Sequence, residues 1–148
     1  FAGELGLLPV GGLPDCKVNR LEQAASGPAI QSLTQQIFND PEKTTRDFFL
    51  AYDQKHPEVQ RRMDDIASAI AQGLYAIVCL LDPHRSVFGG GVVNHHPFLI
   101  DLVKEKLTKV VIREQADVTK RIHLSTFKEN SGAIGAAWQA IEQLASME

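Results

Sequence analysis

The sequence predicts a helix-rich α/β fold, and three observations support this. Two short runs typical of strands, 86–88 and 121–126, alternate with helical patterns in the second half of the chain, as in layered α/β proteins. The first half carries helical patterns and loops. The composition, 44% hydrophobic and 22% charged, is close to the globular average, so 148 residues can bury one core.

The N-terminal part is expected to be a loop followed by two helices. Glycine and proline are frequent in residues 1–20 and periodicity is weak there, which indicates a loop. Ser26, followed by Gly27 and Pro28, is typical of a helix N-cap with proline in the first turn, so a helix is expected over "AIQSLTQQIF". The break "NDPEK" separates it from a second helix over "TTRDFFLAYDQ".

The longest predicted helix runs from Pro57 to about Leu81. Its apolar residues recur every three or four positions and so form one stripe. These residues are Val59, Met63, Ile66, Ile70, Leu74, Ile77 and Leu81. Other apolar residues fill the remaining faces of the last two turns, so Cys79 and its neighbours are expected to be buried on all sides. Pro83 ends the helix.

The second half begins with a strand over 86–88 and three glycines. His96-Pro97 then opens a helix through "FLIDLVKEKLTKV", a strand follows over 121–126, and a last helix spans "SGAIGAAWQAIEQLA". Gly132, Gly135, Ala136 and Ala137 give this last helix a small-residue face. Two strands are too few for an independently stable sheet, so further strands are expected in residues not present here or in a partner chain. The alternative is that some segments assigned as helices are strands.

Charge and composition exclude several classes of protein. The net charge is −3 and the basic residues are scattered, so the chain has no electrostatic footprint for nucleic acid. Two cysteines, Cys16 and Cys79, do not form a disulfide framework and favour a reducing, cytoplasmic location. The longest near-apolar run, 73–81, is too short to span a bilayer, so no membrane association is expected.

Other polar residues give weak signals. Asp64 and Asp65 fall on the polar side of the long helix and are expected to be solvated. His95 and His96 precede a proline and are expected to be a solvated helix entry. Neither a Ser-His-Asp order nor a nucleophile elbow is present.

The glycine turn at 89–91 is the first candidate site. Glycine loses more backbone entropy on folding than any other residue, so three in a row indicate a required geometry or a close approach. The order strand, glycine turn, helix presents a nucleotide at the end of a strand, although "GGGVVN" matches neither GxGxxG nor the P-loop. Two interpretations are open. A backbone without side chains can lie against a base or a ribose, or the glycines only form a tight exit from the strand; the residues alone favour neither interpretation.

Two carboxylates form the second candidate site. Glu4 lies in the glycine-flanked loop "AGELG", and Glu22 lies just before a helix begins. Carboxylates on rigid loops suit the binding of sugar hydroxyls, because each accepts hydrogen bonds from several donors. Glutamate in the first turn of a helix also complements the helix dipole, and for Glu22 taken alone this is the favoured interpretation.

Four segments together resemble the C-terminal half of the ROK family, which contains bacterial sugar kinases and sugar-responsive repressors. They are "AGELG" at 2–6, "LEQAASGPAI" at 21–30, "LLDPHRSVFGGGVV" at 80–93 and "SGAIGAAWQA" at 131–140. Each is modest alone, but their order and spacing are specific. The resemblance implies an actin-like fold with a ribonuclease-H-like α/β core in each of two lobes. Residues 1–148 would then be a single C-terminal lobe of a longer chain, with the N-terminal lobe absent.

The resemblance also implies functional residues and partners. Glu4 and Glu22 match the sugar-contacting glutamates of the family, and Gly89, Gly90, Gly91 and Val92 match its adenosine-binding turn. The small-residue helix at 131–140 would pack closely against the core of the lobe. The parent protein would be a homodimeric hexose or amino-sugar kinase that uses ATP with Mg²⁺; the alternative is the sugar-sensing domain of a repressor. The family's phosphate loop and catalytic base precede this region, so no catalytic residue is expected here and the segment alone would be inactive.

One departure from the family concerns a structural zinc. Family members usually have a His three residues after the first Glu, where this chain has Leu7, and a CxCGxxGC run where it has "PDCKVNRLE". Only Cys16 remains of those zinc-binding cysteines. We therefore predict no structural zinc.

Overall fold

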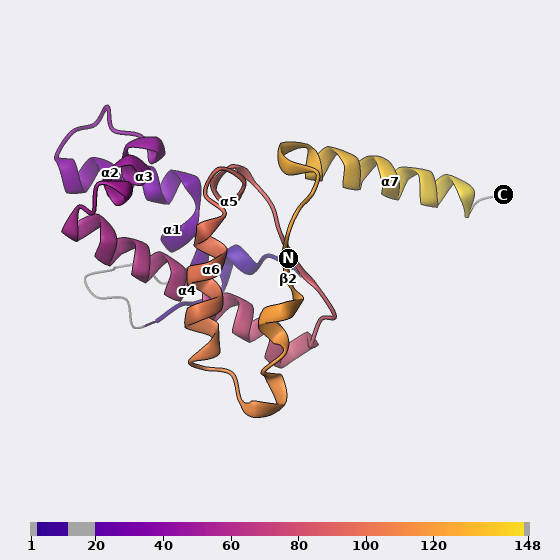
Figure 1. Ribbon diagram of the computed structural model, residues 1–148. Helices are drawn as coiled ribbons and strands as arrows, with labels where there is room; N and C mark the ends of the chain where they lie inside the picture. The colour runs from indigo at the N-terminus through magenta and orange to yellow at the C-terminus, as the bar shows by residue number, and fades with distance from the viewer. Residues whose placement is uncertain (1–2, 12–19, 147–148) are drawn as a thin grey trace.

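The computed structural model describes residues 3–11 and 20–146, which form a helical body with one small sheet (Figure 1). The α-helices are α1 (Leu21–Ala25), α2 (Gly27–Phe38), α3 (Thr45–Asp53), α4 (Pro57–Leu81), α5 (Gly91–His95), α6 (Phe98–Thr108) and α7 (Ser131–Ala145). The strands are β1 (Ser86–Phe88) and β2 (Ile122–Leu124), and short 3₁₀ turns are η1 (Leu5–Leu7), η2 (Arg113–Gln115), η3 (Val118–Arg121) and η4 (Lys128–Asn130).

The first helices begin where their capping residues predict. The Ser26 hydroxyl accepts a hydrogen bond from the Ala29 N–H at 3.3 Å, which confirms it as the N-cap of α2. α3 begins after a capping box, in which the Thr44 N–H donates to Asp47 Oδ2 at 2.9 Å. The short helix α1 was not expected, and it places Glu22 inside a first turn rather than before a helix.

The core lies around α4, whose predicted bounds are confirmed. α4 packs against α6, α1 and α3, and an ion pair between Asp64 and Lys106 also joins it to α6. The core includes Phe48, Val59, Met63, Ile66, Leu74, Leu99, Val103 and Leu107, all at most 4% exposed. The end of α4 contradicts the expectation: Leu80 and Leu81 are 79% and 76% exposed, and Cys79 is exposed as well. Val78 in the same turn is 2% exposed, so other elements cover one face of that end and leave the face with Leu80 and Leu81 open.

Among the described residues, α4 is also the one helix long and apolar enough to cross a membrane by length and composition. The core helix of a soluble protein passes the same test. Nine of its residues are buried against neighbouring elements, so α4 acts here as a core helix.

The two strands form a parallel pair, as the α/β prediction requires. Ser86 pairs with Ile122 and Phe88 with Leu124, and the crossover between them contains α5 and α6. Arg121 fixes β2 to the segment before β1: its guanidinium donates to the Asp82 carboxylate and to the Pro83 carbonyl, both at 2.9 Å. In the described part of the chain, this sheet has two strands.

The last helix does not pack as the sequence predicts. α7 projects away from the body (Figure 1) and has no buried residue. A Cβ added at Gly132 or Gly135 would meet nothing within 4 Å, so its small-residue face contacts no other element. The reason is that three-residue strands β1 and β2 offer no broad sheet face for a 15-residue helix to cover.

Candidate functional site

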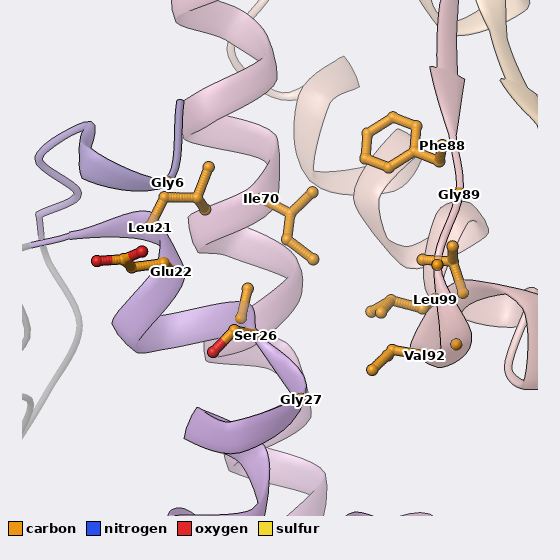
Figure 2. A pocket seen from close by; sticks show the side chains of 14 residues that line it. Gly6, Leu21, Glu22, Ser26, Gly27, Ile70, Phe88, Gly89, Val92 and Leu99 are labelled. Atoms are coloured by element: carbon orange, nitrogen blue, oxygen red, sulfur yellow. The ribbon is translucent and has the colours of Figure 1, made fainter. Parts of the chain in front are cut away.

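One cavity brings together two segments that the sequence analysis treated separately. It has a volume of about 390 Å³ and lies between α1 with the start of α2 on one side and the glycine turn on the other (Figure 2). Glu22 and the run Gly89–Val92 both line it, although 67 positions separate Glu22 from Gly89. Apolar side chains of Leu21, Ile70, Phe88 and Leu99 form much of the wall.

The glycine turn combines a backbone requirement with open space. Gly90 has φ +105°, a conformation that side chains rarely adopt, and it precedes the first residue of α5. Gly91 has no positive φ, and a Cβ added at Gly90 or Gly91 would meet nothing within 4 Å. The need for a tight strand exit therefore explains Gly90 but not Gly91. The backbone of both residues remains open to approach.

The turn is supported from behind by two serines that the sequence analysis missed. The Ser125 N–H donates to the Phe88 carbonyl at 2.7 Å, continuing the pairing of β1 and β2. The Ser125 and Ser131 hydroxyls lie 2.6 Å apart, and a Cβ on Gly89 would lie 3.5 Å from Ser125 Cβ. Only the pairing of the two strands reveals this support, because Ser125 and Ser131 form no motif with the glycines.

The two predicted glutamates differ in their position. Glu22 lies in the first turn of α1 with its carboxylate beside Gly6: a Cβ on Gly6 would lie 3.3 Å from Glu22 Oε2. Figure 2 shows this carboxylate on the α1 side, directed away from the glycine turn. Glu4 is exposed, precedes η1 and is not among the residues that line the cavity.

Two polar pairs are less solvated than the sequence predicts. The His96 ring stacks on Phe49 with centroids 3.5 Å apart, and burial, followed by the nearby His95, lowers the pKa of His96. Burial likewise raises the pKa of Asp65, whose Oδ2 lies 3.8 Å from Arg62 Nη1. The expectation of a solvated site is therefore wrong for His96, which packs on α3 through Phe49, and for Asp65, which is partly buried.

The zinc prediction is not tested. Leu7 ends η1 and is 42% exposed. Cys16 lies outside the described residues. Within residues 3–11 and 20–146, His, Cys, Asp and Glu form no group of three that could hold a metal ion. The absence of a structural zinc stays a prediction.

Comparison with known proteins identifies a family. The sequence model of the ROK family matches residues 1–143. A glucokinase from Halalkalibacterium halodurans is 28% identical over 166 aligned positions, covering 100% of this chain and 50% of the relative. A β-glucoside kinase from Listeria innocua is 26% identical over 102 positions, covering 69% of this chain and 33% of the relative.

Solved structures give the same picture for the fold. A ROK hexokinase from Thermus thermophilus has a TM-score of 0.73 at 26% identity, with 93% of this chain and 48% of that chain covered. A ROK family protein from Streptococcus pneumoniae in complex with sucrose has a TM-score of 0.77 at 23% identity, with 96% and 50% covered. These similarities confirm the predicted actin-like, helix-rich α/β fold. The chain spans about half the length, or less, of these relatives.

Proposed function

Because the chain belongs to the ROK family, we propose that it forms the sugar- and nucleotide-binding lobe of an ATP-dependent hexose or amino-sugar kinase. One observation carries this proposal: Glu22 and the glycine turn Gly89–Gly91 line one cavity. Its volume of about 390 Å³ falls within the range of small-molecule sites. The names of the relatives, a glucokinase and a β-glucoside kinase, favour a kinase over a sugar-sensing repressor domain.

The sugar would bind at the α1 side of the cavity. Among the residues that line the cavity, Glu22 is the one with a carboxylate, and a carboxylate accepts hydrogen bonds from several sugar hydroxyls at once. Glu4 lies two residues before Gly6, whose backbone approaches Glu22. We assign Glu4 as a second sugar contact on the strength of its match to the family motif. Its exposure leaves it free to accept hydrogen bonds.

The nucleoside of ATP would lie against the glycine turn. Flat rings need a surface without protruding side chains, and the open space in front of Gly90 and Gly91 meets that requirement. Gly89 and Val92 complete this segment of the wall. ATP with Mg²⁺ supplies the phosphoryl group when bound; this chain binds and orients the nucleoside and the sugar.

The remaining assignments follow from the same proposal. Residues 1–148 act as a single C-terminal lobe of a cytoplasmic, homodimeric enzyme, with neither nucleic acid nor membrane as a partner of this segment. Phosphoryl transfer relies on positioning and on a carboxylate that accepts the hydroxyl proton. We place that catalytic base in the part of the relatives that this chain does not span.

Calorimetric titration tests the proposal. The chain is titrated with D-glucose, N-acetyl-D-mannosamine and a non-hydrolysable ATP analogue, and we expect heat from a sugar and from the nucleotide. Glu22→Gln should weaken sugar binding by about tenfold, because a hydrogen bond to a charged group contributes about 1.5–3 kcal/mol. Glu114→Gln, an exposed carboxylate outside the cavity, is its control.

A second pair of variants tests the nucleotide side. Gly91→Leu should fill the space before the turn and weaken binding of the ATP analogue by about tenfold or more. Gly135→Leu makes the same change where a Cβ also meets nothing, but on α7, and should leave binding unchanged. Titrations of the unaltered chain that give no heat with either ligand class would contradict the proposal.

A further inference from the structure

Gly73 is the single glycine of α4 and lies buried in the interior of that helix. Glycine in a helix interior costs about 1 kcal/mol relative to alanine, so its presence calls for a reason. A Cβ on Gly73 would lie 2.7 Å from Leu21 Cδ2, closer than real Cβ atoms approach. The missing side chain is therefore what allows the Leu21 side chain of α1 to rest directly on the α4 backbone.

The next residue of α1 rests on a second glycine. A Cβ on Gly6 would lie 3.2 Å from Glu22 Cβ, which is tighter than ordinary contact. Leu21 and Glu22 thus each lie against a glycine, one from α4 and one from η1. The Leu21 N–H also donates to the Leu8 carbonyl at 2.9 Å, so the start of α1 is tied to the segment after η1.

These contacts matter because α1 cannot hold its own position. It has five residues and none of them is buried, and a helix this short is unstable by itself. Yet it carries Glu22, which lines the cavity together with Gly6, Leu21 and Ile70. Ile70 lies on α4 about one helical turn before Gly73. The location of Glu22 beside the cavity depends on how α1 is seated.

We propose that Gly73 and Gly6 are positioning residues that seat α1 between α4 and η1 and thereby fix the Glu22 carboxylate for sugar binding. This inference rests on the proposed function, in which Glu22 contacts the sugar. Gly73 does not line the cavity, whereas Gly6 does. They act through the close approach of backbone to Leu21 and Glu22.

The substitution Gly73→Ala separates positioning from a merely structural role, because its two effects have opposite signs. Alanine is the better helix former, so the α4 helix itself should gain stability. The new methyl group, however, collides with Leu21 Cδ2, so either the Leu21 side chain, which lines the cavity, must rotate or α1 must shift. Since small misplacements of binding groups have large effects, we expect sugar affinity to fall about tenfold.

The experiment compares four forms of the full chain by calorimetry with D-glucose, N-acetyl-D-mannosamine and the ATP analogue. Gly73→Ala should weaken sugar binding and leave nucleotide binding within about twofold of the unaltered chain, a difference of under 0.5 kcal/mol. Gly135→Ala, where a Cβ meets nothing, is the matched control and should change neither. The double variant Gly73→Ala/Leu21→Ala removes the colliding Cδ atoms and should recover part of the lost sugar affinity.

Hydrogen exchange at the Leu21 amide gives a readout that needs no sugar. Its bond to the Leu8 carbonyl should open more often in Gly73→Ala, so exchange should accelerate there and not in Gly135→Ala. Equal sugar affinity and equal exchange in Gly73→Ala and the unaltered chain would overturn the inference while leaving the proposed function intact. A chain that binds no sugar, but whose Leu21 exchange accelerates in Gly73→Ala, would overturn the proposed function and support the seating of α1.

Discussion

His96 is the residue beside the site whose ionisation should affect stability. Burial, and then the neighbouring His95, lower its pKa below the ordinary value of 6.5, against a smaller opposite effect of Asp53. The unfolded chain therefore binds more protons than the folded chain below pH 6.5, so the contribution of His96 to the free energy of unfolding is complete above pH 6.5. That contribution is lost as the pH falls through the folded pKa.

Urea unfolding at several pH values between about 5 and 8 measures this effect. The free energy of unfolding should fall toward low pH more steeply in the unaltered chain than in His96→Phe, which keeps a ring on Phe49 but cannot be protonated. The difference between the two curves isolates His96 from the other groups that titrate in this range. Parallel curves would contradict the assignment.

Glu22 and Gly91 show what single residues reveal in a sequence. For each, the residue type leaves a routine structural interpretation open. Glu22 could simply complement the helix dipole in a first turn, and Gly91 could simply form a tight exit from the strand. For the glycine turn, the structure narrows this choice. The φ of +105° explains why position 90 is glycine, but at Gly91 neither the backbone conformation nor a neighbouring atom within 4 Å requires a glycine. Gly73 belongs to no visible motif, and Gly6 is visible only as part of the loop "AGELG", since the role of both glycines depends on atoms of α1.

At the scale of elements, local signals predicted the helices well. The start of α2 is fixed by capping through Ser26, and the start of α4 by the backbone geometry of Pro57. Both signals depend on a few neighbouring residues. The five-residue helices α1 and α5 escaped prediction because hydrophobic periodicity needs a longer window. Periodicity also cannot tell whether a partner covers an apolar face, and this is why the end of α4 is exposed although its pattern predicts burial. For α7, only close packing of the small-residue face was expected.

The exposure of α7 leads to a prediction about its apolar residues. Ile134, Trp138, Ile141 and Leu144 recur every three or four positions and are 39–69% exposed. Trp138→Ala should therefore change the free energy of unfolding by at most about 0.5 kcal/mol. Phe48→Ala in α3, where the ring is fully buried, should cost about 3–5 kcal/mol.

Urea unfolding of both variants, monitored by far-ultraviolet circular dichroism, measures the two losses on one scale. Circular dichroism is preferred because Trp138 is the single tryptophan of the chain and its removal abolishes tryptophan fluorescence. A cost above about 1 kcal/mol for Trp138→Ala would show that α7 packs as its sequence pattern predicts.

At the scale of the whole molecule, the site depends on contacts between segments that lie far apart in the sequence. No local sequence pattern predicts these contacts. The parallel pairing of β1 with β2 fixes the end of β1, and α4 carries α1 on its surface. Together these elements bring Glu22 and the glycine turn to one cavity. The sequence did not predict this meeting. The resemblance to the ROK family implied a binding role for each of the two segments, through an order of four segments that single motifs lack.

The last prediction concerns activity, because the proposed kinase would bind its ligands in this chain and hold its catalytic base elsewhere. We expect this 148-residue chain to bind sugar and nucleotide but not to transfer the phosphoryl group. In this proposal, binding and orientation use Glu4 and the cavity lined by Glu22 and the glycine turn. Transfer also needs a base within hydrogen-bond reach of the sugar hydroxyl and a cradle for the phosphates. We place both in the half of the relatives that the chain does not span.

Incubation with Mg-ATP and D-glucose or N-acetyl-D-mannosamine, followed by mass spectrometry of the sugars, should find no sugar phosphate above a boiled control. Detectable phosphorylation would mean that residues 1–148 contain a base, and the exposed Glu4 would be the first carboxylate to substitute.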